Sequence, residues 1–386
     1  MTPGARVAAA IEILDAIEGG QPAERALTRW ARASRFAGSK DRAAVRDHVF
    51  DVLRHWRSDA ARGGAETARA RLIGRLRDQG IDPDTLFDGQ GHAPAPLSDL
   101  ERASSGPLEP KGVAWDLPDW LVPVFERSLE VDAKQTALAL TERAPVTLRV
   151  NLSKSTVSDV QAALIGDGIT TAANPRAATA LTVTDGARRI RSSKAYADGR
   201  VEMQDASSQA AVADLGTPGR ALDMCAGGGG KALAMAALGW SVTASDIDMA
   251  RMGDLPNRAT RGGHKIMICP PERLMPSDKF DLVFIDAPCS GSGTWRRAPD
   301  AKWALTQDRL DALTQTQSEI LTQAAKHVAP GGTLVYATCS VLQSENEKRV
   351  QNFTATTSQF RLLRTNRWPV DASGDGFFAA RLTREG

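Results

Sequence analysis

Hydrophobic residues recur at helical spacing in the first 80 residues. Val7, Ala10 and Leu14 fall on one face of a helix, and the Thr2-Pro3 pair is typical of a helix start. A second apolar stripe predicts a helix from Asp41 to Trp56, and the rest of its surface carries Arg42, Arg46, Arg54 and Arg57. These arginines fit either a solvated surface or a contact with RNA phosphates. Residues 1–80 are therefore predicted to form a helical domain.

The next two stretches lose this periodicity. Residues 81–113 are rich in Pro, Gly and Ser and are predicted to be a linker. Residues 114–205 mix short helices and strands. One helix is predicted to end near Glu130, a second to span 133–143, and a third to begin at Ser155 or Thr156. Strands are predicted at 147–151, 180–183 and 201–203. We expect a small α+β module whose basic residues either face solvent or contact RNA.

Residues 206–386 alternate short apolar runs with helical segments. Strands are predicted at 221–224, 241–246, 265–268, 280–285, 333–336 and 377–382, with a long helix over 306–327. Such alternation predicts an α/β fold with a Rossmann-like parallel sheet covered on both faces. Ligands of such sheets bind beyond the carboxyl ends of the strands.

Composition narrows the class of protein. The 386 residues suffice for two or three domains, and the 42% hydrophobic and 24% charged content is ordinary. No apolar run approaches the ~18 residues of a membrane helix, and acids in the first helix argue against a presequence, so we expect a cytoplasmic protein with no membrane partner. The net charge of +2 permits a phosphate-rich partner only through a local patch. Nothing requires more than a monomer.

The four cysteines indicate neither a disulfide framework nor a zinc site. Cys225, Cys269, Cys289 and Cys339 form no CxxC or Cys/His cluster, so no metal is expected. Cys225 is predicted to pack in the glycine-rich turn that it begins, and Cys269 is predicted to be structural.

A glycine-rich turn follows the strand that ends at Asp223. Four glycines let the backbone approach a ligand closely, and Asp246 ends the next strand, where an acid can accept ribose hydroxyls. Lys231 is followed by alanine, so the turn is not a phosphate-cradling NTPase loop. Nicotinamide and S-adenosylmethionine both remain possible cofactors at this point.

Two further motifs suit methylation of a pyrimidine carbon. Cys289 stands three residues after Asp286, and Cys339 lies between Thr338 and Ser340; each motif ends a predicted strand. C5 of cytosine is a poor nucleophile, but a thiolate bonded to C6 makes C5 enamine-like and able to accept a methyl group. An acid near N3 or N4 and a group that aids release complete this chemistry. The spacing alone does not say which thiol attacks.

These motifs resemble those of the RNA cytosine-5 methyltransferases of the Sun/RsmB type. The resemblance covers most of residues 145–386 and rests on Gln204–Gln209, Asp223–Lys231, Ser245–Asp248, Asp286–Trp303, Pro330–Ser340, Glu345-Asn346 and Gly374–Phe378. It implies S-adenosylmethionine as the cofactor. The family turn usually reads Cys-Ala-Ala-Pro-Gly-Gly-Lys-Thr, whereas here Gly227 and Gly228 replace alanine and proline, and Ala232 replaces threonine.

The resemblance also implies residue roles. Cys339 would be the nucleophile, Cys289 would assist release, and Asp286 would contact the cytosine and the cofactor. Asp246 would hold the ribose, Glu272 would face the adenosine, and the turn would hold the methionine part through Cys225, Ala226, Gly227, Gly228, Gly229, Gly230 and Lys231.

The substrate implied is RNA, and a helical domain resembling the antitermination protein NusB marks the small-subunit (16S) ribosomal RNA branch. Residues 114–205 would be an RNA-binding module, and 206–386 the catalytic domain. A transfer-RNA target is an alternative, and so is a non-catalytic RNA-binding assembly factor. Retention of both thiols and Asp286 argues against the assembly factor.

Overall fold

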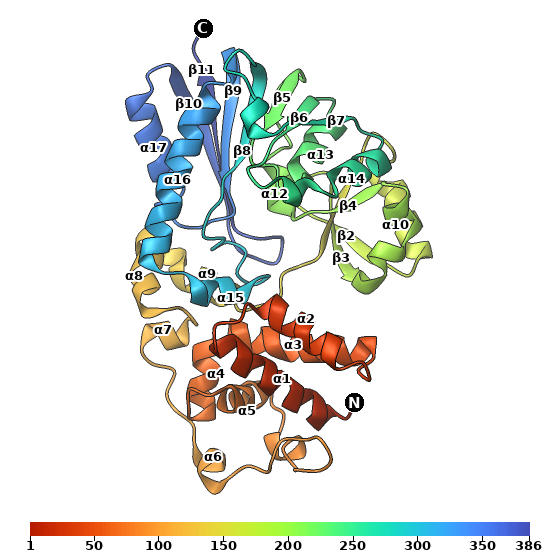
Figure 1. Cartoon of the computed structure of the whole chain (residues 1–386), viewed down its shortest axis with the longest axis vertical. Coiled ribbons are helices and arrows are strands. Elements are labelled where there is room, and N and C mark those ends of the chain that lie inside the picture. Colours follow the sequence, from red (N-terminus) through yellow and green to blue (C-terminus); the bar gives the residue numbers. More distant parts are fainter. The chain divides into compact units, whose positions relative to one another are not determined.

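The computed structural model describes all residues, 1–386, as two compact units (Figure 1). The first comprises residues 1–143 with 295–305, and the second comprises 144–294 with 306–386. This division differs from the ranges predicted above, since residues 81–143 belong with the helical unit. The assignment of 1–80 and 114–205 as RNA-binding domains stays a prediction. No helix is both long and apolar enough to cross a bilayer.

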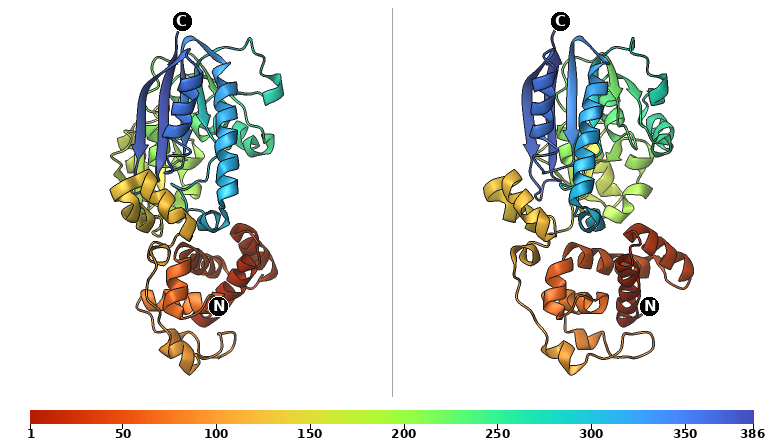
Figure 2. Two further views of the ribbon diagram at one scale, coloured as in Figure 1. Left: turned by 90° about the vertical axis from the view of Figure 1, so that its left-hand side faces the viewer. Right: turned by 60° about the vertical axis from the view of Figure 1, so that its left-hand side comes forward.

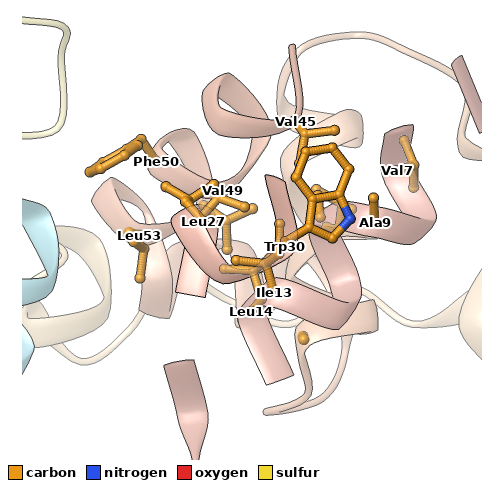
Figure 3. Packing of buried hydrophobic residues seen from close by; sticks show 14 of the residues in the cluster. Val7, Ala9, Ile13, Leu14, Leu27, Trp30, Val45, Val49, Phe50 and Leu53 are labelled. Atoms are coloured by element: carbon orange, nitrogen blue, oxygen red, sulfur yellow. The ribbon is translucent and has the colours of Figure 1, made fainter. Parts of the chain in front are cut away.

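The first unit is a helical bundle. Its longer helices are α1 (Pro3–Glu18), α2 (Ala23–Ala33), α3 (Ser39–Arg54), α4 (Trp56–Gly63), α5 (Ala68–Asp78) and α8 (Val122–Leu129), joined by the short α6 (Asp99–Ala103), α7 (Lys111–Ala114) and α9 (Ala133–Ala139). The predicted start of α1 is confirmed, because the Thr2 hydroxyl accepts a hydrogen bond from Ala5 N. Trp30 and Leu14 lie among the aliphatic residues of α1, α2 and α3 in the core (Figure 3).

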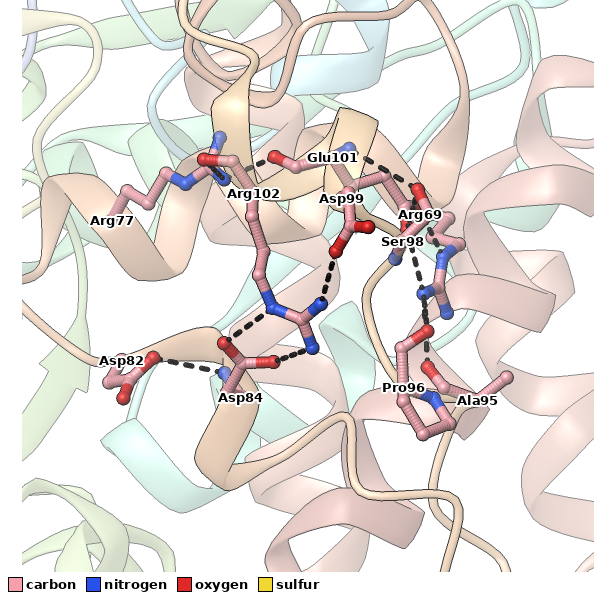
Figure 4. A network of polar contacts seen from close by, with 10 residues as sticks. All are labelled: Arg69, Arg77, Asp82, Asp84, Ala95, Pro96, Ser98, Asp99, Glu101 and Arg102. Atoms are coloured by element: carbon pink, nitrogen blue, oxygen red, sulfur yellow. Dashed lines mark hydrogen bonds and ion pairs between the residues drawn. The ribbon is translucent and has the colours of Figure 1, made fainter.

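The stretch 81–113 is ordered against this bundle. Phe87 and Leu97 are buried in its core. Ion pairs add to this anchoring: Arg102 binds Asp84 and Asp99, and Arg69 binds Glu101 (Figure 4). Water screens exposed pairs of this kind, so the buried apolar side chains stabilise the stretch more.

A segment from late in the chain completes the helical unit. Residues 295–305, including α15 (Pro299–Ala304), belong to it. Trp295 is buried and stacks on Phe125 with ring centroids 5.9 Å apart. The Trp303 indole N–H donates to Leu53 O at 2.7 Å. The helical core therefore requires residues that follow the Cys289 motif in sequence.

The second unit begins with a four-stranded antiparallel sheet of order β2-β3-β1-β4. Its strands are β1 (Thr147–Val150), β2 (Thr170–Ala173), β3 (Ala180–Asp185) and β4 (Val201–Met203), and α10 (Val157–Gly166), α11 (Lys194–Ala197) and α12 (Ala206–Ala210) accompany them. The predicted cap of α10 is Thr156, whose hydroxyl accepts from Asp159 N. Strand β2 was not predicted.

The larger sheet has seven strands in the order β10-β11-β9-β8-β5-β6-β7. Strands β5 (Arg220–Asp223), β6 (Ser241–Ala244), β7 (Ile266–Ile268), β8 (Phe280–Asp286) and β9 (Val328–Thr338) are parallel to one another. Helices α13 (Gly230–Ala237), α14 (Leu255–Gly262) and α16 (Gln307–Ala325) lie on connections between these strands, and α17 (Glu347–Thr356) follows β9. Helix α16 runs beside β8 and β9 (Figure 2). The α/β, Rossmann-like class is confirmed.

The prediction of a wholly parallel sheet was wrong. Strands β10 (Phe360–Trp368) and β11 (Phe377–Arg384) form a hairpin, and β11 pairs antiparallel with β9. A short connection between consecutive strands permits only antiparallel pairing, because a parallel return needs a long crossover. Strand β10 escaped prediction because it is an edge strand with seven consecutive exposed residues and no alternation.

Candidate active site

Four parallel strands bring the candidate residues to one edge of the sheet. Asp223 ends β5, Asp286 ends β8, Asp246 lies two residues beyond β6, and Cys339 follows β9 directly. The register pairs Asp286 with Ala337, two residues before Cys339. Because carboxyl ends of parallel strands share an edge, the order of strands decides which of these side chains become neighbours.

The glycine turn packs closely on α14 and on Asp246. Gly229 has φ +77°, and a Cβ there would lie 2.3 Å from a methyl carbon of the buried Leu255. The buried Asp246 carboxylate accepts from Gly227 N at 2.7 Å and from Asp248 N at 2.9 Å. Arg251 also donates to it at 3.5 Å, so of the about four lone-pair positions of a carboxylate about one remains for a ribose hydroxyl.

Two arginines lie against the glycines that depart from the family pattern. The Arg251 guanidinium is 3.5 Å from Asp246 and would be 2.9 Å from a Cβ at Gly227. Arg258 donates to Gly228 O. Arginine side chains therefore lie beside the two glycines that replace alanine and proline. The sequence did not predict these contacts.

Asp223 is a buried carboxyl group that our candidate set omitted. It is fully buried, and neither oxygen accepts a hydrogen bond of good geometry, although the N–H of Ala232 lies near it. Burial raises its pKa to about 7, against the nearby Lys231 charge and the N–H of Ala232, which lower it. A buried carboxyl group of this kind beside the turn is suited to accept a cationic ligand group. The sequence did not single out Asp223, because it stands at an ordinary strand end. Its burial and its lack of hydrogen bonds of good geometry are visible only in the structure.

Lys231 and Asp286 form an ion pair within the site. Lys231 Nζ lies 2.5 Å from an Asp286 oxygen and 5.1 Å from the centre of the Phe377 ring. Burial lowers the pKa of Lys231, but the charge and hydrogen bond of Asp286 outweigh it, so the net pKa is raised. Lys231 therefore stays an ammonium paired with the partly exposed Asp286.

The two thiols of the sequence motifs meet. Cys289 Sγ lies 3.4 Å from Cys339 Sγ, and both residues are half-buried. The hydrogen bond to Cys339, followed by burial, raises the pKa of Cys289 well above its usual value. The raised pKa keeps Cys289 a thiol in contact with the Cys339 sulfur.

The remaining candidates lie apart from the thiol pair. Glu272 is exposed in a short 3-10 helix (Pro271–Arg273) after β7 and makes no hydrogen bond or ion pair with Asp246. Burial, followed by the charge of Asp223, raises the pKa of Cys225 to about 12, so it remains a thiol in the turn. Cys269 follows β7 and contacts Pro270 O. No group of His, Cys, Asp and Glu residues is arranged to hold a metal ion.

Comparisons with known proteins identify the family of the chain. A family profile described as 16S rRNA methyltransferase RsmB/F matches residues 213–383, and one described as a ferredoxin-like domain of RsmF/B-like methyltransferases matches 117–188. Ribosomal RNA small subunit methyltransferase B of Klebsiella pneumoniae strain MGH 78578 is 33% identical over 83% of this chain and 76% of its own length. That of strain 342 is 33% identical over 69% of this chain and 66% of its own length.

Solved structures share the fold. The protein PH0851 has a TM-score of 0.75 at 24% identity, covering 100% of this chain and 99% of its own. NSun6 from Pyrococcus horikoshii has a TM-score of 0.61 at 17% identity, covering 70% of this chain and 99% of its own.

The sheet and its glycine turn define an S-adenosylmethionine-dependent methyltransferase. The chain belongs to the RsmB/F family of 16S rRNA methyltransferases. The predicted family is thereby confirmed, and so is S-adenosylmethionine as the cofactor.

Proposed function

We propose that this protein methylates C5 of cytosine in small-subunit ribosomal RNA, through a transient bond between Cys339 and C6. The observation that supports this most is the 3.4 Å contact between Cys289 and Cys339, at the same sheet edge as the Lys231–Asp286 pair. The names of the relatives, ribosomal RNA small subunit methyltransferases, support the substrate. Monomeric state and cytoplasmic location stay predictions.

The residues of the turn fit S-adenosylmethionine. The buried Asp223 carboxyl group suits the α-ammonium, the turn from Cys225 to Lys231 would hold the methionine part, and Asp246 has an acceptor position for the ribose. Glu272 stays a proposal for the adenosine. The bound cofactor supplies an electrophilic methyl group.

The cysteines would perform the covalent steps. The Cys339 thiolate adds to C6, and C5 becomes nucleophilic and accepts the methyl group. The C5 proton then passes to water, the C6–S bond breaks, and Cys339 leaves as a thiolate. The Cys289 S–H group, held protonated beside it, hydrogen-bonds to the departing sulfur and so favours release.

Asp286 would select the base. One Asp286 oxygen pairs with Lys231, so its other oxygen would accept a hydrogen bond from the exocyclic amino group of cytosine. Uracil presents a carbonyl oxygen at that position, which would face the carboxylate with no hydrogen between them. The site therefore favours cytosine.

The test uses variants of both thiols. Methyl transfer from labelled S-adenosylmethionine is measured on 16S ribosomal RNA and on transfer RNA. Cys339→Ala is expected to lose at least about 1,000-fold in rate, because the covalent route is gone, while calorimetry still detects the cofactor. Cys289→Ala is expected to accumulate an RNA-linked band on a denaturing gel, because attack survives and release fails.

Cys269→Ala is the matched control, since that thiol lies outside the pair, and it should retain activity. Undiminished turnover by Cys339→Ala would contradict the nucleophile assignment. Methylation of transfer RNA alone would replace the ribosomal substrate, and absence of cofactor binding by the unaltered protein would favour an assembly factor.

A further inference from the structure

A buried carboxylate joins the two cysteine loops. We propose that Glu345 is the positioning residue that holds Cys289 and Cys339 in register, an inference that rests on the function proposed above. Glu345 is fully buried and lies six residues after Cys339, beyond the candidate set. It touches neither sulfur in a recorded hydrogen bond, so it acts through the residues beside them.

Each loop is held through the serine that follows its cysteine. Ser290 donates to Glu345 twice, from its backbone N at 2.8 Å and from its hydroxyl at 2.5 Å. Ser340 donates its hydroxyl to the same carboxylate at 2.5 Å. One carboxylate therefore spans the residues directly after both thiols.

The carboxylate is in turn anchored from outside the loops. Gln317 on α16 donates its amide to Glu345 at 3.0 Å and to Pro288 O at 2.9 Å. The Tyr336 hydroxyl, on β9, donates to Glu345 O at 2.6 Å. A rigid helix and a central strand thus hold the clamp, which is the arrangement that precise placement of reacting groups requires.

The chemistry of the clamp fits a role beyond packing. The four groups that donate to the carboxylate are neutral. The charge of Glu345 is a minor contributor to the raised pKa of Cys289, after the hydrogen bond to Cys339, burial and the charge of Cys339. Glu345 therefore both sets the spacing of the sulfurs and helps keep Cys289 protonated.

Two substitutions separate these effects. Glu345→Ala removes the acceptor and frees both loops. Glu345→Gln keeps the shape, because its amide oxygen accepts from Ser290 N and Gln317 while its NH₂ group donates to the serine hydroxyls, but it removes the charge. Glu347→Gln is the control: it lies two residues on and pairs with Arg367 instead.

The first readout needs no RNA. Diamide takes up two thiol hydrogens and leaves a Cys289–Cys339 disulfide, which peptide mapping quantifies. We expect rapid closure in the unaltered protein and in Glu345→Gln, and closure at least about 10-fold slower in Glu345→Ala, because the sulfurs lose their fixed approach. An unchanged rate in Glu345→Ala, with far-ultraviolet circular dichroism intact, would overturn the proposal.

The second readout tests the charge of Glu345 separately from its hydrogen bonds. It uses Glu345→Gln, so it still applies if Glu345→Ala fails to fold. In a Cys339→Ala background, alkylation of Cys289 by iodoacetamide between pH 8 and 10 should be roughly threefold faster with Glu345→Gln, because thiolate forms more readily. Glu347→Gln should not change it. An alkylation rate unaffected by Glu345→Gln would contradict the electrostatic part of the role.

Methyl transfer then tests the link to catalysis. Glu345→Ala should lower kcat about 100-fold with cofactor affinity retained, as expected for thiols misplaced by about 1 Å. If the unaltered protein methylates no RNA yet the thiol readouts behave as expected, the proposed function fails and the clamp stands. If methylation is normal in Glu345→Ala, the clamp fails and the function stands.

Discussion

At the residue scale, the candidate site divides into residues found from the sequence and residues that required their partners. Cys289, Cys339, Lys231 and Asp286 were found because each follows a recognisable strand or turn, and the structure brings them together in pairs. Glu345 was noticed only as part of a family motif. Its function as a clamp depends on donors from three other segments, which no local pattern encodes.

Asp223 makes a prediction about pH at this scale. Its folded pKa of about 7 exceeds the unfolded value of 3.8, so the folded state binds more protons between these values. Its contribution to stability is therefore fully present below about pH 4 and lost as pH rises through 7. Asp223→Asn should remove this dependence and raise the free energy of unfolding at pH 8 by about 2 kcal/mol.

The same change should weaken cofactor binding at least about 10-fold, because the ammonium loses its acceptor. Denaturant titrations from pH 4 to 8 and calorimetry with S-adenosylmethionine measure the two effects. The exposed Asp311→Asn on α16 is the control and should change neither. Lower stability of Asp223→Asn at pH 8 would show that its carboxyl group has a partner.

At the element scale, the glycine turn packs closely on α14, and this packing limits which residues the turn can contain. Gly229 and Gly239 both have positive φ, +77° and +92°. A Cβ at Gly229 would meet the buried Leu255 at 2.3 Å, whereas one at Gly239 would meet Pro218 at an ordinary 3.7 Å. A residue with a Cβ would be strained at both positions because φ is positive. Only Gly229 also lacks space for the Cβ.

Gly229→Ala is therefore expected to be worse than Gly239→Ala. Both should lose about 1 kcal/mol from backbone strain, and Gly229→Ala about 1–3 kcal/mol more, because Leu255 has no room to move. Thermal unfolding gives the difference, and calorimetry should show cofactor binding impaired only in Gly229→Ala. Equal losses from the two variants would contradict this account of the turn.

Sequence patterns predicted some elements better than others. Strands β5, β6, β8 and β9 were found within a few residues because buried parallel strands read as continuous apolar runs. Strand β10 was missed because its residues face water, and its pairing is antiparallel. An exposed edge strand depends on the neighbour to which it bonds, and the local sequence does not identify that neighbour.

At the scale of the whole molecule, the chain passes between its two units at 143/144, 294/295 and 305/306. The helical unit therefore contains residues that lie more than 150 positions from the rest of it in sequence. Within that unit, Trp295 packs on Phe125 and Arg54 Nε donates to Arg296 O at 2.8 Å.

Trp295→Ala should destabilise the helical unit by about 3–5 kcal/mol, because a buried indole is removed from its core. Hydrogen exchange followed by mass spectrometry should show faster exchange in α8, which carries Phe125. Phe36→Ala, at a position 77% exposed in the same unit, should change stability by less than about 0.5 kcal/mol. Unaltered exchange in α8 would mean that the segment 295–305 is not needed by the bundle.

The sequence by itself determined the α/β class, the parallel strands, the glycine turn and the residues with reactive chemistry. These follow from periodicity and strand ends, which are local properties of the chain. The tertiary structure alone decided that two sulfurs lie 3.4 Å apart, that Asp223 is buried without a hydrogen bond of good geometry, and that residues 295–305 complete the helical unit. Each of these depends on distances between segments far apart in sequence, which only the folded chain sets.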